Sequence, residues 1–108
     1  MTQIMIQYFD GCPNWQVASQ RIRTAIGTRD DVSIDYQPVE TPEDAQRLRF
    51  AGSPTILIDG IDPFAAPHQP IGLTCRVYQT PHGPAGSPTV DQLIHALNAS
   101  STPPNSQG

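Results

Sequence analysis

Two successive patterns of hydrophobic side chains run through the first 27 residues. Ile4, Ile6 and Tyr8 recur at every second position, which predicts a β-strand that ends at the turn Asp10-Gly11. From residue 13 the period lengthens to that of a helix, which Gly27 is expected to close. The predicted apolar face of this helix consists of Trp15, Ala18, Ile22, Ala25 and Ile26.

The next part of the chain repeats this order of strand and helix. Alternating side chains predict a second strand over residues 32–39, and the helix before it is long enough to make the two strands parallel. Residues 41–44, Thr-Pro-Glu-Asp, combine an N-cap, a proline at the first helical position and an acidic residue three positions after the cap. They predict a short helix that buries Ala45 and Leu48 and breaks at Gly52.

The second half of the chain predicts two further strands and a last helix. The expected elements are a strand at 55–58, a loop at 61–72, a strand at 73–78, a loop at 81–86 and a helix through Val90, Leu93, Ile94 and Leu97. The order β-α-β-α-β-β-α predicts an α/β fold with a four-stranded mixed sheet flanked by helices. One domain is expected over residues 1–99, followed by a disordered tail at 100–108.

Composition limits the classes of partner. The 108-residue chain has a net charge of −4, and its six cationic residues are all arginines, so it lacks the concentrated positive surface that nucleic-acid binding needs. No apolar run approaches the roughly 20 residues of a membrane span, and the first residues have no features of a secretory signal. We expect a cytoplasmic monomer that binds neither nucleic acid nor membrane, with its two cysteines reduced at rest.

Cys12 lies where the first predicted strand ends and the first predicted helix begins. A helix N-terminus offers unpaired backbone N–H groups and about half a positive charge, which together stabilise a thiolate. The pKa of the Cys12 thiol is therefore expected below the free-thiol value of about 8.5. Pro13 suits the first helical turn, where a proline loses no hydrogen bond. The alternative is that Cys12 is an inert, small apolar residue at a strand–helix corner.

Residues 52–55, Gly-Ser-Pro-Thr, lead directly into the strand predicted at 55–58. A proline at the mouth of a strand cannot donate to the ladder, and a cis Ser53–Pro54 bond would turn the Ser53 backbone toward Cys12. The alternative is a trans proline that starts the strand. The same four residues recur at 86–89 before a helical pattern, where the proline is expected to be trans.

The motifs at 8–15, Tyr-Phe-Asp-Gly-Cys-Pro-Asn-Trp, and at 52–55 resemble those of the thioredoxin-like superfamily. With Cys-Arg-Val-Tyr at 75–78, the chain is similar to a group of small bacterial thioredoxin-like proteins, some of which carry selenocysteine at the position of Cys12. The resemblance extends to about Leu97 and implies a thioredoxin-like fold.

The resemblance also implies roles for individual residues. Cys12 would be the nucleophile, Pro54 the cis-proline beside it, and the backbone of Ser53 and Thr55 the edge on which substrate docks. The candidate substrate-binding residues are thus Pro13, Trp15, Ser53, Pro54 and Thr55. Trp15 stands where a thioredoxin motif has its second cysteine, and its place on the apolar helix face favours a core or pocket-wall role.

Cys75 is the second candidate catalytic residue, because a single thiol cannot resolve its own mixed disulfide. If Tyr78 pairs antiparallel near Thr55, Cys75 lies about 10 Å along the strand from the Pro54 end, at ~3.3 Å per residue. Disulfide-bonded cysteines have Cα atoms within about 7 Å, so this register separates Cys75 from Cys12. A buried structural Cys75 is therefore expected rather than a resolving one, and a Cys12–Cys75 bridge only as a minor product of oxidation.

No metal site and no cofactor is expected, because His68, Cys75 and His82 lack the tightly spaced pairs of a zinc site. The main hypothesis is a monothiol thiol–disulfide or peroxide-type oxidoreductase, whose Cys12 thiolate attacks a disulfide or oxidised sulfur of a protein or small-thiol substrate. A small thiol or Cys75 would then release the product. The alternatives are a redox-inactive adaptor on the same fold and a thiol binder of soft metals or organometals.

Overall fold

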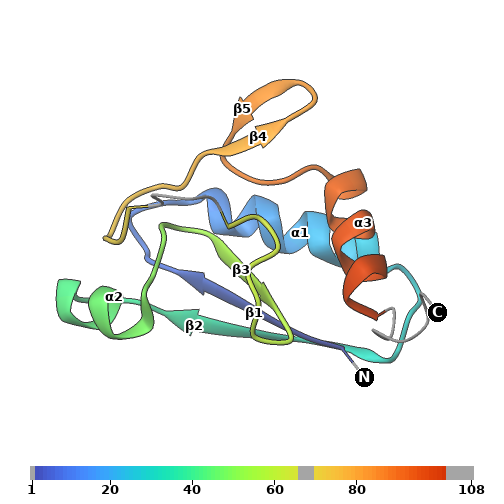
Figure 1. Cartoon of the computed structure of the whole chain (residues 1–108), viewed down its shortest axis with the longest axis horizontal. Helices are drawn as coiled ribbons and strands as arrows, with labels where there is room; N and C mark the ends of the chain where they lie inside the picture. The colour runs from blue at the N-terminus through green and yellow to red at the C-terminus, as the bar shows by residue number, and fades with distance from the viewer. Residues whose placement is uncertain (1, 66–69, 102–108) are drawn as a thin grey trace.

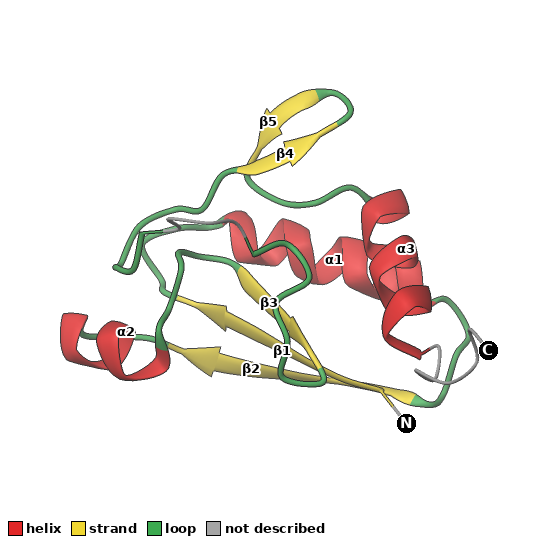
Figure 2. Cartoon of the chain, viewed as in Figure 1, coloured by secondary structure: helices red, strands yellow, loops and turns green. Residues whose placement is uncertain are grey.

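The computed structural model describes residues 2–65 and 70–101 (Figure 1). The elements are β1 (Thr2–Tyr8), α1 (Asn14–Ile26), β2 (Val32–Pro38), α2 (Pro42–Leu48), β3 (Thr55–Ile58), β4 (Tyr78–Thr80), β5 (Gly83–Ala85) and α3 (Val90–Ser101). They form a small α/β fold with a mixed three-stranded sheet, a separate two-stranded hairpin of β4 and β5, and three helices (Figure 2).

The central strand of the sheet is β1, in the order β2-β1-β3. It pairs in parallel with β2, which confirms the crossover expected of α1, and antiparallel with β3. Ile4 is the partner of Ile34 on one side and of Ile58 on the other. In Figure 1, α1 and α3 lie on the same side of the sheet. The core between these two helices and the sheet consists of Ile4, Ile6, Ala18, Ile22, Ile56, Ile58, Leu93, Ala96 and Leu97.

The local signals that delimit the first two helices act as expected, with one exception. Gly27 caps α1 in a positive-φ conformation, and its N–H donates to the carbonyl of Arg23. Thr41 caps α2 by accepting a hydrogen bond from the N–H of Asp44. The predicted break of this helix at Gly52 is wrong, because α2 ends at Leu48 and the next residue takes the left-handed conformation that stops the helix.

The expected fourth strand of the sheet is not formed in the part of the chain that the structure describes. Residues 73–77 are irregular and make one parallel bridge, between Cys75 and Ser53. Strand β4 starts only at Tyr78 and pairs with β5, which lies inside the segment 81–86 that the sequence predicts as a loop.

The outer edge of β3 explains why the fourth strand does not pair there. The chain turns back directly after β3, so that the N–H of Ile58 donates to Ile61 O and the N–H of Ile61 donates to Ile58 O. This turn uses backbone groups that a neighbouring strand would need. The segment that carries Cys75 therefore crosses near the start of β3 instead of running along it.

The C-terminal helix continues past the expected domain end at residue 99. It runs to Ser101, and the remainder of the predicted tail, residues 102–108, lies outside the described residues. Among residues 2–65 and 70–101, none of the helices combines the length and the apolarity needed to cross a membrane.

The core predicts a clear difference between two isoleucine substitutions in helices. Ile22→Ala in α1 removes a fully buried side chain and should lower the free energy of unfolding by about 2–5 kcal/mol. Ile94→Ala in α3 removes a side chain that is 39% exposed and should cost less than about 1 kcal/mol. Denaturant unfolding of both variants measures the difference, and equal losses would contradict the assignment of the core.

Candidate functional site

Cys12 is completely buried in the connection between β1 and α1. Its N–H donates to the carbonyl of Phe9 at 3.2 Å, which closes a turn, and Pro13 then takes the N-cap position of α1. Cys12 thus lies at the start of α1, as expected. This helix has no side-chain cap and no acidic residue in its first turn. No side chain in the first turn of α1 brings a negative charge to the positive N-terminal end of the helix. A thiolate at Cys12 would supply that charge.

The Ser53–Pro54 peptide bond is cis, as the sequence predicts. It is the only cis bond among the described residues, so the bond before Pro88 is trans, also as predicted. Ser53, Pro54 and Thr55 are all buried, and the Thr55 hydroxyl donates to the carbonyl of Gly52 at 2.6 Å. This turn therefore directs the Ser53 backbone into the site and starts β3 immediately afterwards.

The backbone of Ser53 joins the two cysteine-bearing segments. Its N–H donates to the carbonyl of Thr74 at 2.7 Å, and its carbonyl accepts from the N–H of Arg76 at 2.9 Å. Cys75 lies between these two hydrogen bonds and forms a disulfide with Cys12, with the Cα atoms 5.8 Å apart. Cys12 Sγ is also 3.6 Å from the Ser53 carbonyl oxygen. The structure thus brings Cys12, Ser53 and Cys75 into direct contact.

The expected separation of the two cysteines is wrong. That expectation took Cys75 to lie on a strand running antiparallel to β3, which would carry it away from Cys12. In the structure Cys75 pairs instead with Ser53, in parallel orientation and one residue before Pro54, so the sulfur atoms meet. The expectation of a buried Cys75 is also wrong, because this residue is exposed whereas Cys12 is not.

The Ser53 backbone, which the resemblance implies as part of the substrate-docking edge, forms hydrogen bonds within the protein itself. Both the N–H and the carbonyl of Ser53 bond to the segment around Cys75, and its hydroxyl accepts a hydrogen bond from the N–H of Phe9 at 3.4 Å. While the disulfide is closed, the Ser53 backbone therefore holds Cys75.

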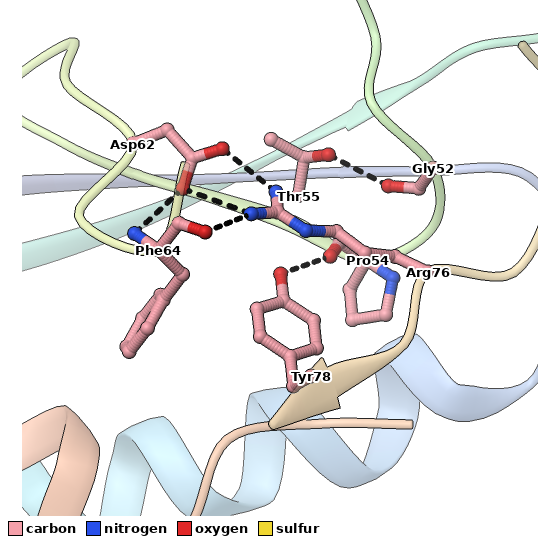
Figure 3. Close-up of polar contacts among 7 residues, drawn as sticks. All are labelled: Gly52, Pro54, Thr55, Asp62, Phe64, Arg76 and Tyr78. Atoms are coloured by element: carbon pink, nitrogen blue, oxygen red, sulfur yellow. Dashed lines mark hydrogen bonds and ion pairs between the residues drawn. The ribbon is translucent and has the colours of Figure 1, made fainter. Parts of the chain in front are cut away.

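A buried ion pair fixes the segment that follows Cys75 (Figure 3). The guanidinium of Arg76 donates to Asp62 at 2.7 and 3.4 Å and to the carbonyl of Phe64 at 2.6 Å. The Arg76 side chain is only 1% exposed and that of Asp62 is 16% exposed. Arg76 also lies over the ring of Tyr78, 4.7 Å from its centre. The loop after β3 is thereby joined to the segment that carries Cys75.

Tyr78 adds a second connection from the same segment. Its hydroxyl donates to the carbonyl of Pro54 at 2.5 Å, as Figure 3 shows. Burial raises the pKa of Tyr78 well above its ordinary value, and the charge of Asp62 adds to this effect while that of Arg76 opposes it. The phenol therefore stays protonated at neutral pH and keeps its role as donor.

Gly52 allows the close approach of the two segments. It has a φ of +105°, and a Cβ added there would lie 3.0 Å from Cβ of Arg76. No pattern in the sequence groups Gly52, Asp62, Arg76 and Tyr78 as one set. The inward alternation of Arg76 and Tyr78 in the Cys-Arg-Val-Tyr phrase is the signal that could have identified two of them.

Trp15 takes the core role that its place on the apolar helix face predicts. Its ring is partly buried and packs against the main core. It stacks on Tyr8 with ring centres 4.3 Å apart and meets the edge of Tyr36 at 6.1 Å. Pro13 is exposed beside the buried Cys12.

Two histidines, His68 and His82, remain among the candidates. His82 is exposed in the hairpin and lines a cavity of about 880 Å³ between α3 and the loop after β3, which contains neither cysteine. His68 lies outside the described residues. Among residues 2–65 and 70–101, no cluster of three or more His, Cys, Asp or Glu side chains is arranged to hold a metal ion.

Comparison with protein-family models, curated proteins and solved structures gives no match to this chain.

The ion pair beside Cys75 generates a prediction for two arginine variants. Arg76→Met leaves Asp62 without its partner in a largely buried position, and the free energy of unfolding of the oxidised protein should fall by about 2–4 kcal/mol. Arg47→Met removes an ion pair whose arginine side chain is 67% exposed, and should change stability by no more than about 0.5 kcal/mol. Urea denaturation compares the variants. A loss in Arg76→Met as small as that in Arg47→Met would show that the ion pair does not hold this segment.

Proposed function

We propose that this chain is a thiol–disulfide oxidoreductase on a thioredoxin-like fold, with Cys12 and Cys75 as its redox pair. The observation that carries the proposal is the pairing of a buried cysteine at the start of a helix with an exposed cysteine from a distant, irregular segment. The proposal replaces the one-thiol mechanism by a two-thiol mechanism, because Cys75 lies at bonding distance from Cys12.

The chemistry is a two-electron exchange between dithiol and disulfide. In the reduced protein one thiolate attacks a substrate disulfide, forms a mixed disulfide and expels a substrate thiolate. The second cysteine thiolate then attacks the protein sulfur of the mixed disulfide, which closes the Cys12–Cys75 bond and releases the other substrate thiolate. The substrate disulfide gains the two electrons that the protein dithiol loses. An external thiol reductant then reduces the Cys12–Cys75 disulfide, is itself oxidised to a disulfide, and so restores the protein dithiol.

The start of α1 supports the step in which the Cys12–Cys75 disulfide opens. When the disulfide opens, Cys12 leaves as a thiolate at the positive end of a 13-residue helix that has no side-chain cap and no acidic residue in its first turn. A stabilised thiolate is both a better leaving group and a more abundant nucleophile near neutral pH. The electrostatics of α1 thus favour opening of the bond on the Cys12 side.

The arrangement of the sheet supports the thioredoxin-like part of the proposal. The order β2-β1-β3, the parallel β1–β2 pair and the antiparallel β1–β3 pair are compatible with it. The cis-proline is compatible as well, since it follows Ser53, whose carbonyl oxygen lies 3.6 Å from Cys12 Sγ. The sheet has three strands rather than the expected four, so the fold assignment remains part of the proposal.

Catalysed reduction of a disulfide-bonded protein by dithiothreitol tests this function. Wild-type protein should accelerate the reduction of insulin, followed as turbidity. Both Cys12→Ser and Cys75→Ser should lower the accelerated rate by at least about tenfold, because neither remaining thiol can complete the exchange alone. Thr74→Ser is the matched control, since it changes an exposed neighbour of Cys75 and keeps the backbone bond to Ser53.

Two outcomes would contradict the proposal. One is a wild-type protein that gives no acceleration over dithiothreitol alone. The other is retention of the full rate by both cysteine variants, which would show that the pair has no part in the reaction.

A further inference from the structure

The two cysteines of the disulfide differ in their exposure to solvent, and this difference has a chemical consequence. No part of Cys12 is exposed, whereas Cys75 is exposed, as is its neighbour Thr74, and Val77 is 60% exposed. Thiol–disulfide exchange requires an incoming thiolate to reach one sulfur, and the rate depends on which sulfur is accessible.

We propose that Cys75, not Cys12, is the cysteine that exchanges with external thiols and disulfides, and that Cys12 is the internal resolving thiol. This inference rests on the proposed function and assigns an order to its steps. It reverses the roles that the resemblance to thioredoxin-like proteins implies, in which Cys12 meets the substrate.

In the reducing direction, an external thiolate attacks the Cys75 sulfur. A new sulfur–sulfur bond forms between them, the Cys12–Cys75 bond breaks, and Cys12 leaves with the electron pair as a thiolate. A second external thiolate then attacks the first external sulfur, which releases Cys75 as a thiolate and an external disulfide. Two external thiols are oxidised and the protein disulfide is reduced, so atoms and electrons balance.

The surroundings of Cys12 support its place as the leaving group. In-line attack on one sulfur expels the other, so attack at the exposed Cys75 requires Cys12 to carry the negative charge. Cys12 lies at the uncapped positive end of α1, whereas Cys75 lies on an irregular segment that offers no helix end. In-line attack at Cys12 would instead require a nucleophile to enter the buried turn between β1 and α1. Access at Cys75 and the helix end beside Cys12 therefore favour the same direction.

Ser53 explains how Cys75 can be exposed and yet held in place. The Ser53 N–H donates to the carbonyl of Thr74 at 2.7 Å and the N–H of Arg76 donates to the Ser53 carbonyl at 2.9 Å, so the residues on either side of Cys75 fix its backbone. The Arg76 side chain is buried, whereas Thr74 and Cys75 are exposed. An incoming thiolate thus meets an exposed cysteine whose backbone is held in place.

Sulfite cleavage of the oxidised wild-type protein tests the assignment. Sulfite attacks one sulfur of a disulfide, leaves a stable S-sulfonate there and frees the other cysteine as a thiol. After acid quenching, the free thiol is alkylated with N-ethylmaleimide and the peptides are mapped by mass spectrometry. We expect S-sulfonate on Cys75 and alkylation on Cys12, in at least about tenfold excess over the reverse pattern.

The same protein unfolded in guanidinium chloride is the control, because both sulfurs are then accessible and the S-sulfonate should be distributed over both cysteines. S-sulfonate on Cys12 in equal or greater amount in the folded protein would overturn the assignment, and so would resistance of the folded disulfide to sulfite. If the label lies on Cys12 while insulin reduction persists, the order of steps is wrong and the proposed function stands. If the label lies on Cys75 but insulin reduction is absent, the proposed function is wrong.

Discussion

The two backbone hydrogen bonds between Ser53 and the segment around Cys75 are the constraint on which the site depends. They fix the position of Cys75 relative to the turn before β3, and the same Ser53 carbonyl lies 3.6 Å from Cys12 Sγ. One buried residue therefore sets the positions of both cysteines, which are 63 positions apart in the chain. Besides this bridge, the Cys75 segment is held by the backbone hydrogen bond from Gly72 N–H to the carbonyl of Phe50 and by side chains.

The side chains of Arg76 and Tyr78 also hold the Cys75 segment in place. Arg76 binds Asp62 and the carbonyl of Phe64, and Tyr78 donates to the carbonyl of Pro54. A buried arginine needs such partners, because an unpaired charge in this environment would be costly. Gly52 leaves the space that the Arg76 backbone requires. The contacts around Cys75 thus form one connected set, which joins its segment to the loop after β3 and to the turn before β3.

The elements that depend on local signals could be predicted from the sequence, and the position of Cys75 could not. The periods of β1 and α1, the Gly27 and Thr41 caps and the turn before β3 all lie within a few neighbouring residues. The location of Cys75 instead depends on Arg76 reaching Asp62, 14 residues earlier, and on a turn after β3 that uses the edge expected for a fourth strand. The first is a long-range contact and the second is a local turn at a strand edge. Neither leaves a periodic pattern, so a regular strand register was the natural and incorrect expectation.

The proposed function requires the Cys12–Cys75 disulfide to open and close in a folded protein, and an equilibrium titration tests this requirement most directly. The oxidised fraction is measured by alkylation across glutathione redox buffers, with near-UV circular dichroism as the measure of folding in the same samples. We expect the disulfide to reduce reversibly at a potential above about −300 mV, the upper end of the range typical of structural disulfides, while the tertiary signal is retained. A disulfide that resists every glutathione buffer, or one that opens only as the tertiary signal is lost, would show a structural bond and contradict the account.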